Sequence, residues 1–131
     1  MIPLYNIHLH ITFQESIQKT LKKYRSESLE KRLYAELDKL CDGPRRNAHR
    51  SLRGVGDLGQ QVVLRRARLR HFRLIFLVDT QQQRIFPLYL SPRPRNGYSY
   101  ENMGELVELA EDFLNDFAAR RYDRFARWAC E

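Results

Sequence analysis

Arginine is concentrated in the middle of this sequence. Between Pro44 and Arg95 there are twelve arginines, no lysine and only two acids, Asp57 and Asp79. Arginine presents a planar fork of donors that matches a phosphate group, and it stays charged at any ordinary pH. Guanidinium groups held in fixed positions can therefore bind a polyanion and also stabilise negative charge that develops on it. The sequence predicts that this segment contacts a polyanion.

The elements that must position these arginines are three short strands. From Val62 onward the sequence has the two-residue period of a strand. One face of this first strand is shared by Leu64, Arg66, Arg68 and Arg70. The opposite, buried face is expected to carry Val63, Ala67 and Leu69. Alternate strand residues lie about 6.6–6.8 Å apart, close to the spacing of successive phosphates. A solvated strand face is the alternative, and the scarcity of acids favours a phosphate track.

The second strand is the most apolar part of the chain. Phe72–Val78 is apolar on both faces apart from Arg73, as expected of a central strand. Because a charge is costly to bury without a partner, Arg73 should reach a cleft or a carboxylate. Residues 84–90 return as a third strand, in which Pro87 removes one ladder donor and predicts an edge or a bulge.

Two loops carry further arginines. Residues 44–59, which include Arg53, contain three glycines and no sustained period, so an irregular segment with tight turns is expected. Residues 91–97 leave the sheet as an exposed loop with Arg93 and Arg95. Arg93 lies between two prolines, a rigid setting that is consistent with holding a guanidinium where substrate arrives, and a simple loop charge is the alternative.

Helices flank these strands. Residues 4–11 alternate as a half-buried strand, and Thr12 with Glu15 matches a capping box, so a helix is expected to start at Thr12. A second helix follows and ends at Gly43, where glycine can adopt a left-handed conformation. A third helix begins near residue 102 and has an acidic outer face that would repel nucleic acid. Phe125 and Trp128 then lie in a short extra helix or a docking tail, over residues 118–131.

Composition limits the class of protein. The chain has 131 residues and a net charge of +7, which fits a single domain over residues 1–131 and favours an anionic partner. Cys41 and Cys130 lack metal or redox spacing and are expected to be free thiols. His8 and His10 alternate on one strand, but no nearby cluster completes a metal site. No cofactor is expected.

No targeting segment or membrane span is expected either. The amino end lacks a basic start followed by a long apolar run, and no segment reaches the roughly 18 apolar residues of a membrane helix. These features predict a cytoplasmic protein without a membrane partner.

The order of elements and one set of motifs resemble a known family. The order is strand, two helices, three antiparallel strands and a helix. The most specific motifs are Arg65–Val78, which forms a hairpin, and Leu88–Arg93 followed by Tyr98. The chain resembles the RelE/ParE superfamily of type II toxin–antitoxin toxins over essentially its whole length. The resemblance implies an α+β fold in which the three-stranded meander joins the first strand in one small sheet.

The resemblance also implies an activity. Ribosome-dependent members of the superfamily are messenger RNA interferases, which drive the ribose 2′-hydroxyl onto the neighbouring phosphate without a metal. By position, Arg73 and Arg93 would clamp the phosphate, and Tyr98 would stack on or orient a base. The family commonly has a lysine on the preceding strand, whereas this chain has Arg66, which is a poor general base. His71, which stands where the family usually has glycine, could supply that base.

The implied partners are messenger RNA, the ribosome and a cognate antitoxin whose acidic or amphipathic segment would cover the arginines. Further RNA contacts are expected from Arg53, Arg65, Arg68, Arg70 and Arg95. Two alternatives remain: a non-catalytic inhibitor of DNA gyrase, as in the ParE-like members, and a plain RNA- or ribosome-binding module. Arg73, Arg93 and Tyr98 together favour the nuclease, while the absent lysines and the tail with Phe125 and Trp128 favour the binders.

Overall fold

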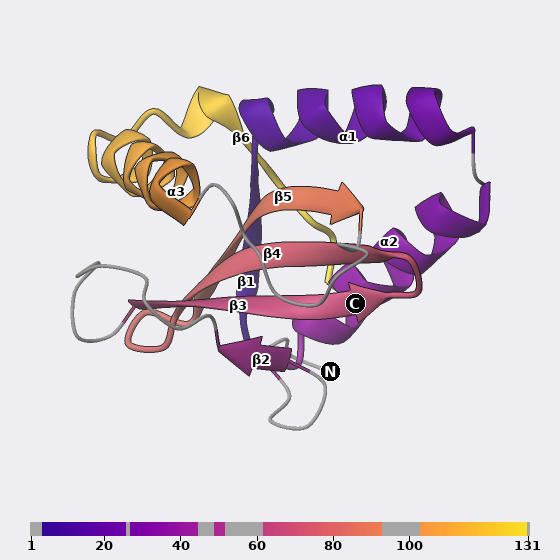
Figure 1. The fold of residues 1–131 in the computed structure, drawn as a ribbon. Helices are drawn as coiled ribbons and strands as arrows, with labels where there is room; N and C mark the ends of the chain where they lie inside the picture. The colour runs from indigo at the N-terminus through magenta and orange to yellow at the C-terminus, as the bar shows by residue number, and fades with distance from the viewer. Residues whose placement is uncertain (1–3, 26, 45–48, 52–61, 93–102, 131) are drawn as a thin grey trace.

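A computed structural model describes residues 4–25, 27–44, 49–51, 62–92 and 103–130. Within these residues, three α-helices pack on one mixed β-sheet (Figure 1). The helices are α1 (Ile11–Tyr24), α2 (Glu27–Leu40) and α3 (Met103–Ala118). The strands are β1 (Asn6–His10), β2 (His49–Ser51), β3 (Val62–Leu69), β4 (Phe72–Asp79), β5 (Arg84–Pro92) and β6 (Phe125–Arg127), and a 3-10 turn, η1, spans Tyr122–Arg124. The predicted α+β fold is confirmed.

The strands are ordered β2-β3-β4-β5-β1-β6 across the sheet. β3, β4 and β5 form the predicted antiparallel meander, and β1 joins it by pairing parallel to β5. The register between β4 and β5 shifts between Ile75 and Phe76, which pair with Tyr89 and Pro87 respectively. Of the two outcomes predicted from Pro87, the structure has the bulge, since β5 lies inside the sheet.

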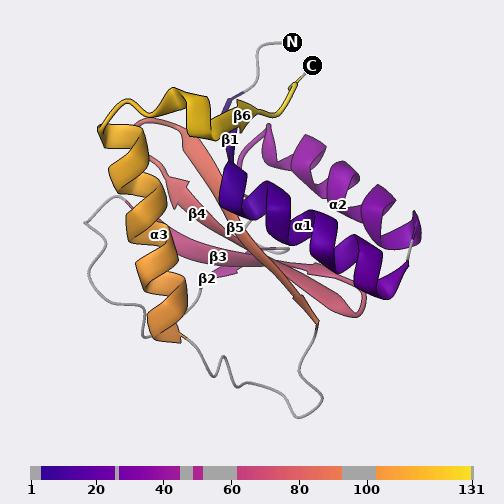
Figure 2. The same ribbon diagram turned by 90° about the horizontal axis from the view of Figure 1, so that it is seen from above.

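Helices cover both faces of the sheet (Figure 2). On one side, Tyr24 of α1 packs edge-on against Phe72, with ring centroids 4.9 Å apart. On the other side, Phe117 of α3 packs against Phe86, with centroids 5.4 Å apart. We call the first side, which the helical hairpin of α1 and α2 covers, the hairpin face. The second is the arginine face, and it carries Arg66, Arg68, Arg73, Tyr89 and Ser91.

The burial predicted for β3 is wrong at its first residues. Val63, expected inside, is 37% exposed, whereas Leu64, expected among the arginines, is buried. Leu64 lies opposite the buried Leu77, on the side that α3 covers. Because the sheet has helices on both faces, burial along β3 does not follow one alternating pattern.

Helix α1 begins differently from the prediction. The residue that caps it is His10, whose Nδ1 accepts a hydrogen bond of 3.1 Å from the Thr12 N–H, so the expected capping box at Thr12 is wrong. The His10 Nε2 is 2.8 Å from Asp116 Oδ2 on α3. His10 is buried and stacks on Phe113, and it therefore ties the start of α1 to the end of α3.

Helix α2 ends as the glycine predicts. Gly43 has φ +99°, in the region that side chains disfavour. A Cβ atom at this position would lie 3.0 Å from Cε1 of Tyr5, so any other residue would also require the Tyr5 ring to shift.

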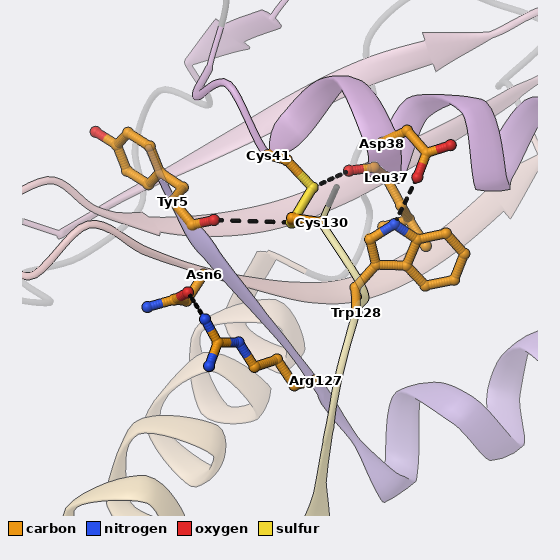
Figure 3. Close-up of a disulfide and its surroundings, with 8 residues drawn as sticks. All are labelled: Tyr5, Asn6, Leu37, Asp38, Cys41, Arg127, Trp128 and Cys130. Carbon is orange, nitrogen blue, oxygen red and sulfur yellow. Dashed lines mark hydrogen bonds between the residues drawn. A yellow bond between two sulfur atoms is a disulfide. The ribbon is translucent and has the colours of Figure 1, made fainter. Parts of the chain in front are cut away.

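The cysteines form a disulfide, which contradicts the expected free thiols. Figure 3 shows Cys41, just after α2, bonded to Cys130 near the end of the chain. The two residues are separated by 89 positions, so sequence spacing gave no indication of the pairing. The Trp128 indole donates a 2.8 Å hydrogen bond to Asp38, and the Arg127 guanidinium donates to Asn6 (Figure 3).

Two short strands were not predicted. β2 falls in the segment expected to be irregular and pairs with β3, with Ser51 opposite Arg65. β6 falls in the expected helix or tail and pairs antiparallel to β1, with Leu9 opposite Ala126. The Phe125 and Trp128 side chains pack against the chain's own core. None of the helices in the described segments combines the length and the apolar character needed to cross a membrane.

Candidate RNA-binding face

The β3–β4–β5 register brings three of the predicted arginines onto one face. In one row across the strands, Arg66 lies opposite Ile75, which lies opposite Tyr89. In the next row, Arg68 lies opposite Arg73, which lies opposite Ser91. Directly opposed residues have Cα atoms about 4.5–5.5 Å apart, so the arginines of these two rows are near neighbours.

The arginines of this face differ in exposure. Arg73 is 4% exposed, while Arg68 is exposed and Arg66 is half-buried. Arg73 therefore lies at the base of the cluster, and Arg68 presents its charge to solvent. A guanidinium held below the surface by its surroundings is pre-organised, which is the property that stabilisation of a developing anion requires.

The one acid in β3, β4 and β5 is engaged elsewhere. Arg84 donates to Asp79 Oδ2 from both Nη2 (2.7 Å) and Nε (3.2 Å), and the Asp79 Oδ1 accepts the Gln82 N–H at 3.1 Å. Asp79 is at the far end of β4 from Arg73, about 20 Å away along the strand. The Asp79 charge is thus compensated by Arg84, at the opposite end of the strand from Arg68 and Arg73.

The turn between β3 and β4 contains two more candidates. Arg70 and His71 link the paired residues Leu69 and Phe72, and both are exposed. Arg70 has φ +61°, a left-handed conformation that a side chain adopts at a cost. His71 is two residues from Arg73, at the end of the strand where the arginines face each other.

Arg65 lies apart from these residues. It is opposite Phe76 on the hairpin face and is half-buried. Because consecutive strand residues point to opposite faces, Arg65 cannot share a surface with Arg66 within the same strand. The remaining predicted residues, Arg53, Arg93, Arg95 and Tyr98, lie outside the described residues.

Sequence reasoning missed Tyr89 and Ser91 on this face. Simple alternation along β5 gives no reason to place Tyr89 beside the arginines, since Leu88 and Leu90 on either side of it are both buried. Pro87 was the available signal, because it predicts a bulge. A bulge changes which of the following side chains point to each face of the sheet.

A cluster of aromatic rings closes the other end of the arginine face, beneath α3. The His8 ring lies 5.4 Å from Phe86 and 4.7 Å from Phe117 between ring centroids. Burial, followed by the nearby charges of Arg127 and Arg84, lowers the pKa of His8 to about 4. His8 is thus a neutral packing residue near neutral pH, and its aromatic contacts hold α3 to β1 and β5 together with the His10–Asp116 hydrogen bond.

The exposed side of α3 is acidic. Its exposed residues include Glu105, Glu108, Glu111 and Asp112. Because α3 and the arginines share one side of the sheet, these carboxylates border the arginine face, so a polyanion is expected to approach from the β3–β4 turn, away from α3.

Comparison with known proteins agrees with this architecture. No family model and no curated protein matches the sequence. Among solved structures, the chain is similar to a chain in the crystal structure of the archaeal RelE–RelB complex from Pyrococcus horikoshii OT3, with a TM-score of 0.55 and 26% sequence identity. The match covers 70% of this chain and 98% of that chain. The protein therefore has a RelE-like toxin fold. The similarity supports a place among the toxins of toxin–antitoxin systems.

Proposed function

We propose that the protein is a toxin-like endoribonuclease that cleaves messenger RNA, in particular ribosome-bound message, without a metal ion. The observation that carries the proposal is the direct pairing of Arg68 with Arg73 on the face that also holds Arg66. The similarity to the chain of a RelE–RelB complex supports the toxin assignment.

The reaction is an internal transfer at one phosphate. The ribose 2′-oxygen forms a bond to the adjacent phosphorus while the bond from phosphorus to the leaving 5′-oxygen breaks. The 2′-hydroxyl loses a proton to a base, and the 5′-oxygen gains one. Negative charge builds on the non-bridging oxygens of the phosphate, and guanidinium groups already in place stabilise that charge without reorganisation.

Each arginine has a separate part in this scheme. Arg73 is the clamp on the reacting phosphate, together with Arg93. Arg66 and Arg68 hold the flanking backbone, since strand residues two apart match successive phosphates. Tyr98 orients a base. His71, in the turn beside Arg73, is the candidate general base, because imidazole can accept the proton that a guanidinium cannot.

The proposed inhibitor is a separately encoded antitoxin. The archaeal structure contains RelB together with RelE, which supports a partner of this kind. An acidic or amphipathic antitoxin segment would complement the arginine face and compete with RNA for it.

This function places the protein in the cytoplasm with translated message. The disulfide must then persist among reducing thiols. Cys41 is buried with 6% exposure, which limits attack on its sulfur, whereas Cys130 is half-buried and is the more accessible of the two sulfurs.

Primer extension on messages undergoing translation tests the proposal. Purified wild-type protein is expected to cut the message at defined positions. Arg73→Lys keeps the charge but loses the planar fork, and it should reduce cleavage at least about 100-fold, the usual effect of removing one preorganised donor. Arg93→Ala should do the same. Arg32→Ala, on the exposed side of α2, is the matched control and should cleave normally.

The control measurement is the Tm of each variant, because Arg73 is buried. Loss of cleavage in a variant that keeps its Tm supports the clamp. Intact messages with the wild-type protein contradict the nuclease, and arrested DNA replication under those conditions would indicate the gyrase-directed alternative.

A further inference from the structure

Tyr89 is an exposed aromatic residue in the middle of a buried strand. Its exposed fraction is 41%, whereas Leu88 and Leu90 on either side are each 1% exposed. Tyr24 and Tyr34 are similarly exposed, but each packs against another ring, Phe72 and Trp128 respectively. Within the described part of the chain, no ring contact of this kind involves Tyr89.

The bulge in β5 sets the direction of Tyr89. Ile75 pairs with Tyr89 and Phe76 pairs with Pro87, so Leu88 is the extra residue. In a regular ladder, Leu88 would lie opposite Ile75, and Tyr89 would lie opposite Leu74 on the hairpin face, beneath α1 and α2. The extra residue moves Tyr89 to the arginine face and keeps both leucines in the core.

The position of Tyr89 relative to the arginines suits one nucleotide step. Tyr89 and Arg66 lie in the same row with Ile75 between them, about 10 Å apart across two strand spacings. Arg68 and Arg73 lie in the next row, about 7 Å further along the strands. A backbone that follows the arginines would therefore bring a base within reach of the Tyr89 ring.

We propose that Tyr89 is a stacking platform for a base of a single-stranded RNA whose phosphates lie on Arg66, Arg68 and Arg73. The inference rests on the proposed ribonuclease function and adds a base-binding position to it. An aromatic ring stacks on any base, so Tyr89 contributes affinity and register with little sequence preference.

Binding of a short fluorescein-labelled single strand with 2′-O-methyl riboses tests this role, because that probe cannot be cleaved. Tyr89→Leu is expected to weaken binding about ten-fold or more, and Tyr89→Phe should bind like the wild type. Arg68→Ala should make the dependence of log K on log salt shallower by about 0.7, the value for one phosphate of a single strand. Tyr89→Leu should leave that slope unchanged.

A second probe isolates stacking. With a strand of the same length and charge that has no bases, the wild type and Tyr89→Leu should bind equally. Tyr122→Leu, an exposed tyrosine on η1, is the matched control and should bind both probes normally.

The outcomes separate the two proposals. If the wild type binds the probe with a salt-dependent affinity and Tyr89→Leu binds equally well, the stacking role is wrong and the ribonuclease proposal stands. The same conclusion follows if Tyr89→Leu also binds the probe without bases more weakly than the wild type does. If the wild type does not bind the free probe, the stacking role is wrong, and primer extension on translated message decides the ribonuclease proposal separately.

Discussion

Arg68 of β3 and Arg73 of β4 lie directly opposite each other on the same face of the sheet. Like charges in directly opposed positions destabilise an antiparallel pair. The opposed pair of arginines therefore favours binding of an anion and lowers the stability of the fold, which is a common trade-off at functional sites.

Replacement of Arg68 by threonine should therefore stabilise the fold and weaken function. Threonine favours strands, and the loss of the opposed charge should raise the free energy of unfolding by about 0.2–1 kcal/mol. RNA affinity should fall in the same variant. Urea denaturation and RNA titration measure the two effects. A variant that loses stability and keeps its RNA affinity would contradict this assignment.

The disulfide should contribute a large part of the stability. Cys41 and Cys130 close a loop that spans most of the chain, and Cys130→Ser is expected to lower the free energy of unfolding by about 2–4 kcal/mol. Added reductant should lower the stability of the wild type and leave Cys130→Ser unchanged. If the unfolded, unreduced wild type shows two titratable thiols, the bond is absent.

The lowered pKa of His8 predicts that the stability of the fold depends on pH below neutrality. Its folded pKa of about 4 is below the unfolded value of 6.5, so the unfolded chain binds more protons between these values. Stability should therefore be constant above about pH 6.5 and fall as the pH decreases toward 4. Because His8 is only half-buried, solvent screening limits the expected loss to about 1 kcal/mol.

Urea midpoints at about pH 7 and about pH 5 measure this slope. The aromatic neighbours of His8 make His8→Phe a suitable control, which should reduce the slope. Asp116 acts in a lower range, since the hydrogen bond from His10 holds its pKa below the usual 3.8, and its stabilising effect is lost only as the pH falls further. Equal slopes in wild type and His8→Phe would assign the effect to other groups.

Substitution by glycine can test the backbone strain at Arg70, in the turn between β3 and β4. Since Arg70 has φ +61°, Arg70→Gly should relieve strain and raise the free energy of unfolding by about 0.5–1 kcal/mol, as measured by urea denaturation. Arg68→Gly, two residues earlier in β3, should be destabilising and serves as the contrast. A less stable Arg70→Gly would mean that the Arg70 side chain has contacts that outweigh the strain.

The sequence was sufficient for the order of the three helices and of the strands β1, β3, β4 and β5. The three-stranded meander, the two-helix hairpin and the C-terminal helix follow from local periodicity, and the termination of α2 shortly before Gly43 follows from backbone chemistry at one residue. These features depend on neighbours within a few positions, so local patterns report them.

Contacts between distant positions were not available from the sequence. The Cys41–Cys130 bond, the pairing of β6 with β1 and the capping of α1 by a histidine bonded to α3 each join residues that only folding brings together. The predicted burial of the first residues of β3 was wrong for a related reason, since burial depends on which helix covers each end of the strand.

The candidate site shows the same division. Residue type and charge identified Arg66, Arg68 and Arg73 as a group, and the register then separated Arg65 from them and added Tyr89. A side chain's face depends on the cumulative register of the strands, which a single bulge shifts by one residue. Local sequence thus determined which groups are present, and the tertiary pairing of strands decided which of them share a surface.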